Sequence, residues 1–188
     1  MNYRHLASCS VAFAALVLAP ALAQETPNPA QPQAETPKPS EPAVDGQNQT
    51  PPEYLDNRST PETLIRSYYN AINRQEYARA YSYYAPDNTP KPFPEFQAGY
   101  ENTASVKVLF GKAEGEGAAG SAYWSKPVAI ESTSKEGKTE VFNGCYRLRL
   151  ANPAIQGVPY VPMSILDGTL EKSDKPLDQS VPEGCEAP

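Results

Sequence analysis

The 188-residue chain contains a single histidine, His5, and only three cysteines, Cys9, Cys145 and Cys185. Because His5 lies almost at the N-terminus, the body of the chain cannot assemble a Ser-His-Asp or Cys-His nucleophile system. It cannot assemble a His/Cys zinc site either, since two cysteines without histidine do not complete a tetrahedral ligand set. We therefore expect neither a bound metal nor a cofactor.

Long apolar runs are also missing, and a membrane-spanning helix needs roughly 20 such residues. The run at residues 11–18 (VAFAALVL) is much shorter, follows a positive charge, and precedes the small-residue sequence ALA at residues 21–23. These three parts are typical of a secretory signal. We predict a signal peptide over residues 1–23, no transmembrane segment after cleavage, and a periplasmic or secreted protein that begins at Gln24.

The cysteines allow two roles. Residues 6–9 (LASC) match a lipoprotein cleavage pattern, but in such signals the apolar core precedes the cysteine, whereas here it follows. We therefore assign Cys9 to the signal peptide. Cys145 and Cys185 remain in a compartment where disulfides persist. We predict that they pair and tether a tail at residues 176–188; a reactive thiol or an intermolecular bridge is the alternative.

Positive charge is scarce. The chain has 16 basic residues, and loss of Arg4 with the signal leaves 15 against 22 acidic residues, a net charge of −7. Nucleic acid binding depends on neutralising phosphates with Lys and Arg, so this balance argues against it. It argues equally against attraction to anionic lipid surfaces.

Residues 24–58 are rich in Pro, Gln, Glu and Thr and poor in apolar side chains. Such a segment cannot bury enough surface to offset the entropy lost on ordering, so we predict a disordered, proline-rich linker. Its prolines favour extended polyproline II geometry, which makes it a semi-rigid spacer. A PxxP ligand is the alternative interpretation, although the modules that recognise it belong mostly to cytosolic signalling.

Residues 59–175 show the periodicities of a folded domain. A hydroxyl cap, a proline and an acid at residues 59–62 predict a helix start, and apolar residues then recur at helical spacing. Two further aromatic stripes, at residues 77–84 and 93–100, predict two more helices. The period then changes to two, and we predict four antiparallel strands separated by turns at residues 111–120, 136–138 and 156–159. Pro127 indicates a bulge or an edge position. The predicted class is α+β, with three N-terminal helices on one face of a curled four-stranded antiparallel sheet.

Three sequence stretches resemble the NTF2-like superfamily, also called SnoaL-like or ketosteroid-isomerase-like. They are residues 68–81 with the pattern YYNAIN followed by YARAY, residues 93–111, and residues 142–148 (FNGCYRL). The resemblance covers about residues 60–172 and implies a cone, in which the sheet wraps around a long helix and leaves a pocket at its open end. It implies no single activity, because this fold carries enzymes and inert binding modules alike.

The resemblance and the aromatic residues together suggest a ligand pocket. We expect it to be lined by Tyr69, Tyr84, Trp124 and Tyr146 and to hold a small apolar or sugar-like ligand, since flat rings offer contact area at low entropic cost. The alternative interpretation, which has equal weight, is that the same rings fill the core. We also consider a cell-envelope interaction module that binds an envelope protein.

The enzymatic alternative is a ketosteroid-isomerase-like site, which uses a carboxylate base with a tyrosine and a protonated acid. Its candidate acids are Glu131, Glu140 and Asp167, which lie on or near predicted strands. None of them matches a catalytic position of the superfamily, so we assign no catalytic residue and expect a non-catalytic domain.

Overall fold

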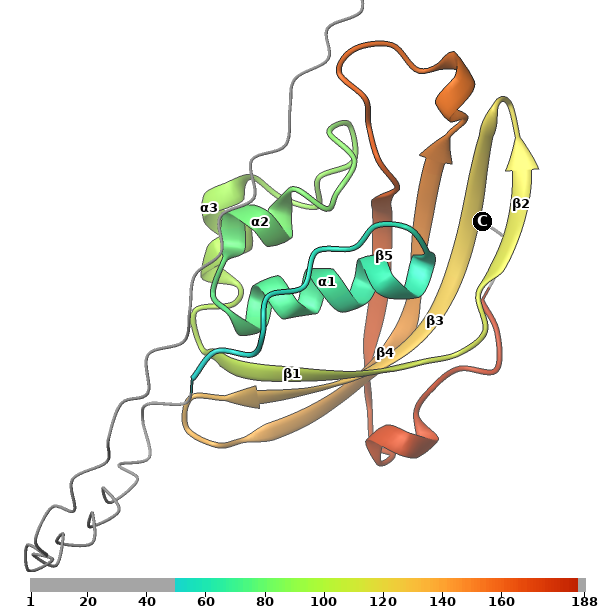
Figure 1. Cartoon of the computed structure of the whole chain (residues 1–188). Coiled ribbons are helices and arrows are strands. Elements are labelled where there is room, and N and C mark those ends of the chain that lie inside the picture. Colours follow the sequence, from blue (N-terminus) through green and yellow to red (C-terminus); the bar gives the residue numbers. More distant parts are fainter. Residues whose placement is uncertain (1–49, 186–188) are drawn as a thin grey trace, which may run out of the picture. The chain divides into compact units, whose positions relative to one another are not determined.

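The computed structural model describes residues 50–185, which form an α+β domain with three helices and one five-stranded antiparallel sheet (Figure 1). The predicted signal peptide, Cys9, and the linker up to residue 49 lie outside the described residues. The elements in chain order are α1 (Pro61–Asn73), α2 (Tyr77–Tyr81), α3 (Phe93–Ala98), β1 (Thr103–Phe110), β2 (Glu114–Ala118), β3 (Ser121–Ser134), β4 (Thr139–Ala151), the 3-10 turn η1 (Pro153–Ile155), β5 (Ser164–Ser173) and the 3-10 turn η2 (Leu177–Gln179).

Helix α1 begins where the sequence predicted. Thr60 caps it by accepting a hydrogen bond from the backbone N–H of Thr63, and the Thr63 hydroxyl accepts one from the backbone N–H of Thr60. Pro61 occupies the first turn, where no backbone N–H donor is needed. One side of α1 is fully buried and crosses the face of the sheet that we call the inner face (Figure 1).

The sheet has the order β1-β3-β4-β5, and β2 pairs with β3 beyond the end of β1. We predicted a Gly-rich turn over residues 111–120 and four strands; this was wrong, because β2 lies within that stretch and gives a fifth strand. Alternating glycines have no side chains that signal a strand face, so the pattern reads as a turn. Strands β1 and β2 run along the same edge of β3, separated by residues 111–113.

Pro127 explains the break between β1 and β2. Its carbonyl accepts a hydrogen bond from Gly111, so its own nitrogen, which has no hydrogen, faces the same edge. Residues 111–113 therefore stand opposite Lys126 and Pro127, two residues of β3, and the register resumes on either side. This confirms the predicted bulge at Pro127.

Strand β4 alternates as the sequence predicted. Tyr146 and Leu148 are buried on the inner face against α1, whereas Cys145 and Arg147 belong to the opposite, outer face. The core between sheet and helices consists mainly of aromatic and aliphatic side chains from α1, the α2–α3 region and β3 to β5. The turn at Gly137 between β3 and β4 is also confirmed, with a positive φ of 82°.

Two predicted boundaries differ in the structure. Helix α2 ends at Tyr81, so Tyr84 is not helical; residues 83–85 instead pair with Ile165 through two backbone hydrogen bonds of 2.8 Å. The last strand, predicted to begin at residue 160, begins at Ser164. In both cases the apolar spacing fits a longer helix or strand, but hydrogen bonds to another segment end the element earlier. Local periodicity contains no information about such contacts.

Residues 52–57 were assigned to the linker but lie along the helices. The side chain of Asn70 accepts a hydrogen bond from Leu55 N and donates one to the Glu53 carbonyl. Arg79 donates to the Leu55 carbonyl at 2.8 Å, and Tyr83 donates to Asp56 at 2.8 Å. The ordered domain therefore begins before residue 59, because polar side chains of α1 and α2 bind the backbone of this segment.

The edge of β1 is closed by a side chain. The Asn73 amide donates to the Val106 carbonyl at 2.8 Å, and its oxygen accepts from the Val106 N–H at 2.7 Å. Asn73 thus takes the place of a neighbouring strand at this residue and connects the end of α1 to the sheet.

Candidate functional site

Three of the four predicted pocket residues lie together. Tyr69, Tyr84 and Tyr146 are 2%, 9% and 3% exposed and surround Tyr68, whose ring contacts each of theirs edge-on at centroid distances of 4.9 to 6.2 Å. Two of these rings come from α1, one from the segment beside β5 and one from β4. We call these four residues the tyrosine cluster.

The hydroxyls of the cluster bind one another or a neighbouring tyrosine. Tyr69 and Tyr146 share a hydrogen bond of 2.6 Å, and Tyr68 shares one of 2.6 Å with Tyr100. Burial raises the pKa values of Tyr68, Tyr69 and Tyr146 well above the usual value, and it raises the pKa of Tyr84 to about 12. These phenols are therefore neutral at physiological pH, and they fill the core with their polar groups paired.

Trp124 lies elsewhere on the inner face, near the start of β3, and only its partly buried ring contacts the edge of the core. It lines a concavity of about 440 Å³ together with Pro61, Ala113, Gly115, Glu116, Gly117 and Ala122. The indole lies over Gly115: a Cβ added there would be 2.6 Å from the Trp124 ring. We call this the Trp124 concavity.

A second concavity of about 490 Å³ adjoins the first, because both are lined by Gly117 and Ala122. Its remaining lining comes from the tip of the β2–β3 hairpin and from Leu150, Asn152 and Pro153. Both lie at one end of the sheet, where β2 supplies backbone with almost no side chains. Neither concavity includes a residue of the tyrosine cluster.

A buried lysine, Lys126, lies two residues along β3 from Trp124. Lys126 is 4% exposed; its ammonium group donates to the Gly111 carbonyl at 2.7 Å and forms an ion pair with Glu62 at 3.4 Å. A hydrogen bond from Arg66 is the main cause that lowers the pKa of Glu62. The group fixes the start of α1, and with it Pro61, against the sheet.

Sequence analysis missed Lys126, although the strand pattern contained its signal. It shares the alternation of Val128 and Ile130, which places it on the inner face. A lysine in phase with core positions is a buried charge that requires a partner.

The candidate acids of the isomerase alternative are all ion-paired, and only the charge of Asp167 reaches the tyrosine cluster, where it adds to burial in raising the pKa of Tyr84. Glu131 pairs with Lys107 at 2.8 Å, Glu140 pairs with Lys138 and Lys172 at 3.0 Å, and Asp167 binds Arg147. The hydrogen bond from Lys172 is the main cause that lowers the pKa of Glu140. None of the three makes a hydrogen bond to a tyrosine within residues 50–185, so the base and phenol of that chemistry are not brought together.

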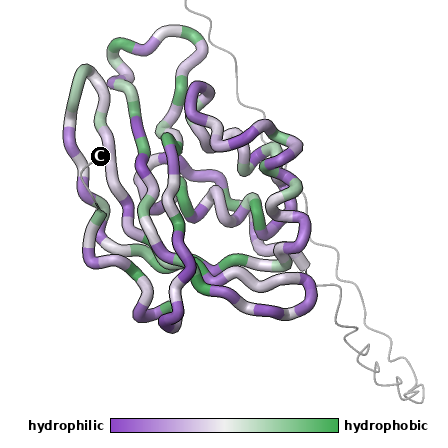
Figure 2. Tube along the Cα trace, turned by 180° about the vertical axis from the view of Figure 1, so that it is seen from behind, coloured by the Kyte–Doolittle hydropathy of each residue, from purple (hydrophilic) through white to green (hydrophobic). Residues whose placement is uncertain are grey.

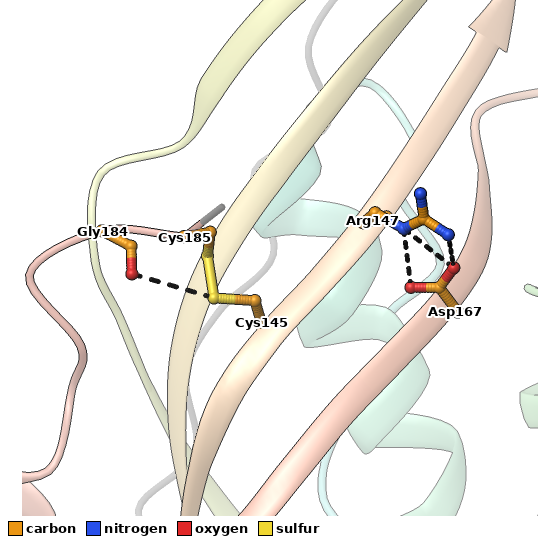
Figure 3. Close-up of a disulfide and its surroundings, with 5 residues drawn as sticks. All are labelled: Cys145, Arg147, Asp167, Gly184 and Cys185. Atoms are coloured by element: carbon orange, nitrogen blue, oxygen red, sulfur yellow. Dashed lines mark hydrogen bonds and ion pairs between the residues drawn. A yellow bond between two sulfur atoms is a disulfide. The ribbon is translucent and has the colours of Figure 1, made fainter. Parts of the chain in front are cut away.

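The predicted disulfide between Cys145 and Cys185 is formed, with a Cα–Cα distance of 6.0 Å. Figure 3 shows it on the side of β4 that faces away from α1, next to the bidentate ion pair of Arg147 and Asp167. The tail that precedes Cys185 crosses the outer face, because a Cβ on Gly111 would meet Val181 at 3.2 Å. The predicted pairing of Cys145 with Cys185 is confirmed.

Within the described part of the chain, no group of three or more His, Cys, Asp or Glu side chains could hold a metal ion. No helix among residues 50–185 is long and apolar enough to cross a membrane.

No protein-family model matches the sequence, and the search of curated proteins finds no match. Among solved structures, the chain is similar to a crystal structure from Novosphingobium aromaticivorans described as a "putative aromatic ring hydroxylase". The similarity has a TM-score of 0.44 at 11% identity and covers 60% of this chain and 90% of that one. A TM-score of this size assigns neither a family nor an activity to the chain.

Proposed function

We propose that the chain is an exported, non-catalytic module of the NTF2-like type that binds a small apolar or sugar-like ligand in the Trp124 concavity. The observation that carries this proposal is the division of the inner face. The tyrosine cluster is closed and internally hydrogen-bonded, whereas the open volume adjoins a tryptophan and bare glycine backbone. The concavity, of about 440 Å³, is shallow and open to solvent, so it suits a ligand that lies on the indole face and is not enclosed.

The chemistry of the lining favours such a ligand. Trp124 offers a flat ring on which an apolar chain or a sugar ring can lie, and the open backbone at Gly117 allows close approach. Of the lining residues only Glu116 is charged. Of the residues first predicted to bind the ligand, the proposal keeps Trp124. It assigns Tyr69, Tyr84 and Tyr146, which are buried, to the hydrophobic core.

Export is supported by the Cys145–Cys185 disulfide, because such bonds persist in oxidising compartments. Intact mass of the protein isolated from the envelope tests this part: we expect a chain that begins at Gln24. A mass that includes the uncleaved signal, or a lipid on Cys9, would contradict it.

Ligand binding can be read directly from Trp124, because it is the only tryptophan of the chain. We expect saturable changes in its emission when the mature protein is titrated with a medium-chain fatty acid or with common envelope sugars. Calorimetry should show that Trp124→Ala loses the binding. Tyr123→Phe is the matched control, since Tyr123 lies one residue away on the outer face beside Arg149, and it should bind normally. No saturable response to either ligand class, or equal loss in both variants, would refute the proposal.

A further inference from the structure

The loop between β4 and β5 exposes apolar side chains. Val158 is fully exposed, at 102% of its reference area, and Ile155, Tyr160 and Val161 are exposed as well. Figure 1 shows this loop beyond the end of the sheet, at the top of the view, and Figure 2 shows hydrophobic segments within it. Of the six large exposed apolar residues in the described chain, these four lie in this loop, so the exposure is concentrated rather than scattered.

The loop itself contains no charged residue. Residues 150–166 form an uninterrupted stretch without Asp, Glu, Lys or Arg, and so do residues 117–125 at the β2–β3 hairpin. The two stretches meet, because Asn152 donates to the Gly120 carbonyl and Ile155 approaches Gly120. Arg149 donates to the Ser121 hydroxyl of the hairpin at 3.1 Å, so the part of this end that can enter an apolar medium without desolvating a charge is the β4–β5 loop itself.

The loop is held in place by its own polar groups. The Gln156 side chain donates to the Ala151 carbonyl at 2.9 Å and accepts from the Val161 N–H at 2.8 Å. The Asn152 side chain accepts from Ala154 N at 3.0 Å. Part of the loop backbone is therefore already hydrogen-bonded, which lowers the cost of taking it out of water.

We propose that residues 150–166, which we call the charge-free end, dock the protein on an uncharged lipid surface, with Val158 and Tyr160 inserted among the headgroups. The apolar side chains project outward from a loop and do not line a groove, so they suit a fluid medium that needs no matching shape. Tyr160 combines an apolar ring with a hydroxyl, a combination that favours the membrane–water interface. No basic residue lies in either stretch, which excludes attraction to anionic headgroups as the cause.

The test is co-flotation of the mature chain with phosphatidylcholine vesicles. We expect binding that neither rises when phosphatidylglycerol is added nor falls in high salt. Val158→Asp and Tyr160→Asp should each lower the partition coefficient about tenfold or more, because each removes one inserted apolar side chain. Both side chains are exposed, so circular dichroism should show an unchanged fold. The matched control is Leu109→Asp on β1, at a residue 39% exposed and outside the charge-free end, which should bind as the wild type does.

Several outcomes would overturn the proposal. These are no flotation of the wild type, equal loss in Leu109→Asp, or binding that requires the anionic lipid. Light scattering that shows a dimer dissociated by Val158→Asp would assign this end to a second copy instead. The result is separable from the ligand proposal, because Val158 does not line the Trp124 concavity and its variants should leave the Trp124 response intact.

Discussion

The phenolic oxygens of Tyr69 on α1 and Tyr146 on β4 lie 2.6 Å apart, although 77 positions separate the two residues in sequence. Both side chains are almost fully buried, so the hydrogen bond connects the central helix to the middle of the sheet inside an apolar core. A buried hydroxyl without a partner is costly, which makes this pair a stability element and not a free binding group.

This pair predicts a non-additive mutational cycle. Tyr69→Phe or Tyr146→Phe alone should lower the free energy of unfolding by about 1–3 kcal/mol, because the remaining hydroxyl loses its buried partner. The double substitution should cost much less than the sum of the two single ones. Urea unfolding of the four proteins measures the coupling; strictly additive losses would show that the two hydroxyls act independently.

The buried phenols also predict a loss of stability at alkaline pH. Burial raises the pKa of Tyr84 to about 12, whereas in the unfolded chain it is about 10. Above about pH 10 the unfolded state releases this proton and the folded state does not, so the unfolded state binds fewer protons and stability falls as pH rises. The contribution is fully present below about pH 10 and is lost towards about pH 12.

Urea unfolding across this range, with phenolate absorbance as a second probe, measures the slope. Each such tyrosine contributes up to about 1.4 kcal/mol per pH unit, and Tyr84→Phe should reduce the slope accordingly. The comparison with Tyr84→Phe isolates the phenol from lysines that titrate nearby. Identical slopes in the two proteins would contradict the assignment.

The fold was predictable from the sequence where the residues of a single helix or strand determine its structure by their own spacing. The cap at Thr60, the alternation around Tyr146 and the pairing of Cys145 with Cys185 follow from local spacing and from the number of cysteines. The glycine strand β2 and the helix end before Tyr84 did not, because both depend on a partner elsewhere in the chain.

The candidate site divides in the same way. The sequence identified the aromatic residues but could not show that Trp124 lies away from Tyr69, Tyr84 and Tyr146. Trp124 pairs with Leu148 on β4, two residues along the strand from Tyr146, and packs only against the edge of the same core. The concavity is lined by Gly115 and Gly117, which have no side chains to fill it. Hydrophobic periodicity is a pattern of side chains, so it cannot predict a concavity of this kind.

The edge of β1 offers a test of how α1 is attached to the sheet. Asn73→Ala removes both hydrogen bonds to the Val106 backbone, and we expect a loss of about 1–3 kcal/mol in the free energy of unfolding. Asn73→Asp keeps an acceptor for the Val106 N–H but removes the donor to its carbonyl, so its cost should differ from that of alanine. Hydrogen exchange at Val106 should accelerate in the alanine variant, and unchanged protection would contradict the assignment.

Reduction of the disulfide should release only the end of the tail. Opening the Cys145–Cys185 bridge should cost about 2–4 kcal/mol and lower the melting temperature by several degrees. The Ser180 hydroxyl stays bonded to the Pro176 carbonyl at 2.8 Å, so the turn at η2 should remain ordered. Hydrogen exchange with and without reductant should show faster exchange in residues 181–185. Equal protection in both samples would show that packing holds this end, and the paired Cys145→Ser and Cys185→Ser substitutions control for the reductant.

The contact between Gly115 and Trp124 gives the most direct test of the concavity. A methyl group at residue 115 would lie 2.6 Å from the indole Cδ1 and 2.7 Å from its Nε1, so Gly115→Ala must move the ring into the concavity or out of the sheet. At Gly117 the nearest atom to an added methyl is the Ser121 carbonyl oxygen at 4.0 Å, so Gly117→Ala is tolerated and serves as the matched control. Both positions are exposed and on the same strand, which equalises their effects on strand propensity. We expect Gly115→Ala to shift the Trp124 emission, and Gly117→Ala, whose methyl group does not reach the indole, to keep the wild-type emission. If both variants keep the wild-type emission, the indole does not lie over Gly115 in solution. The proposed stacking of a ligand on Trp124 in the concavity would then be contradicted.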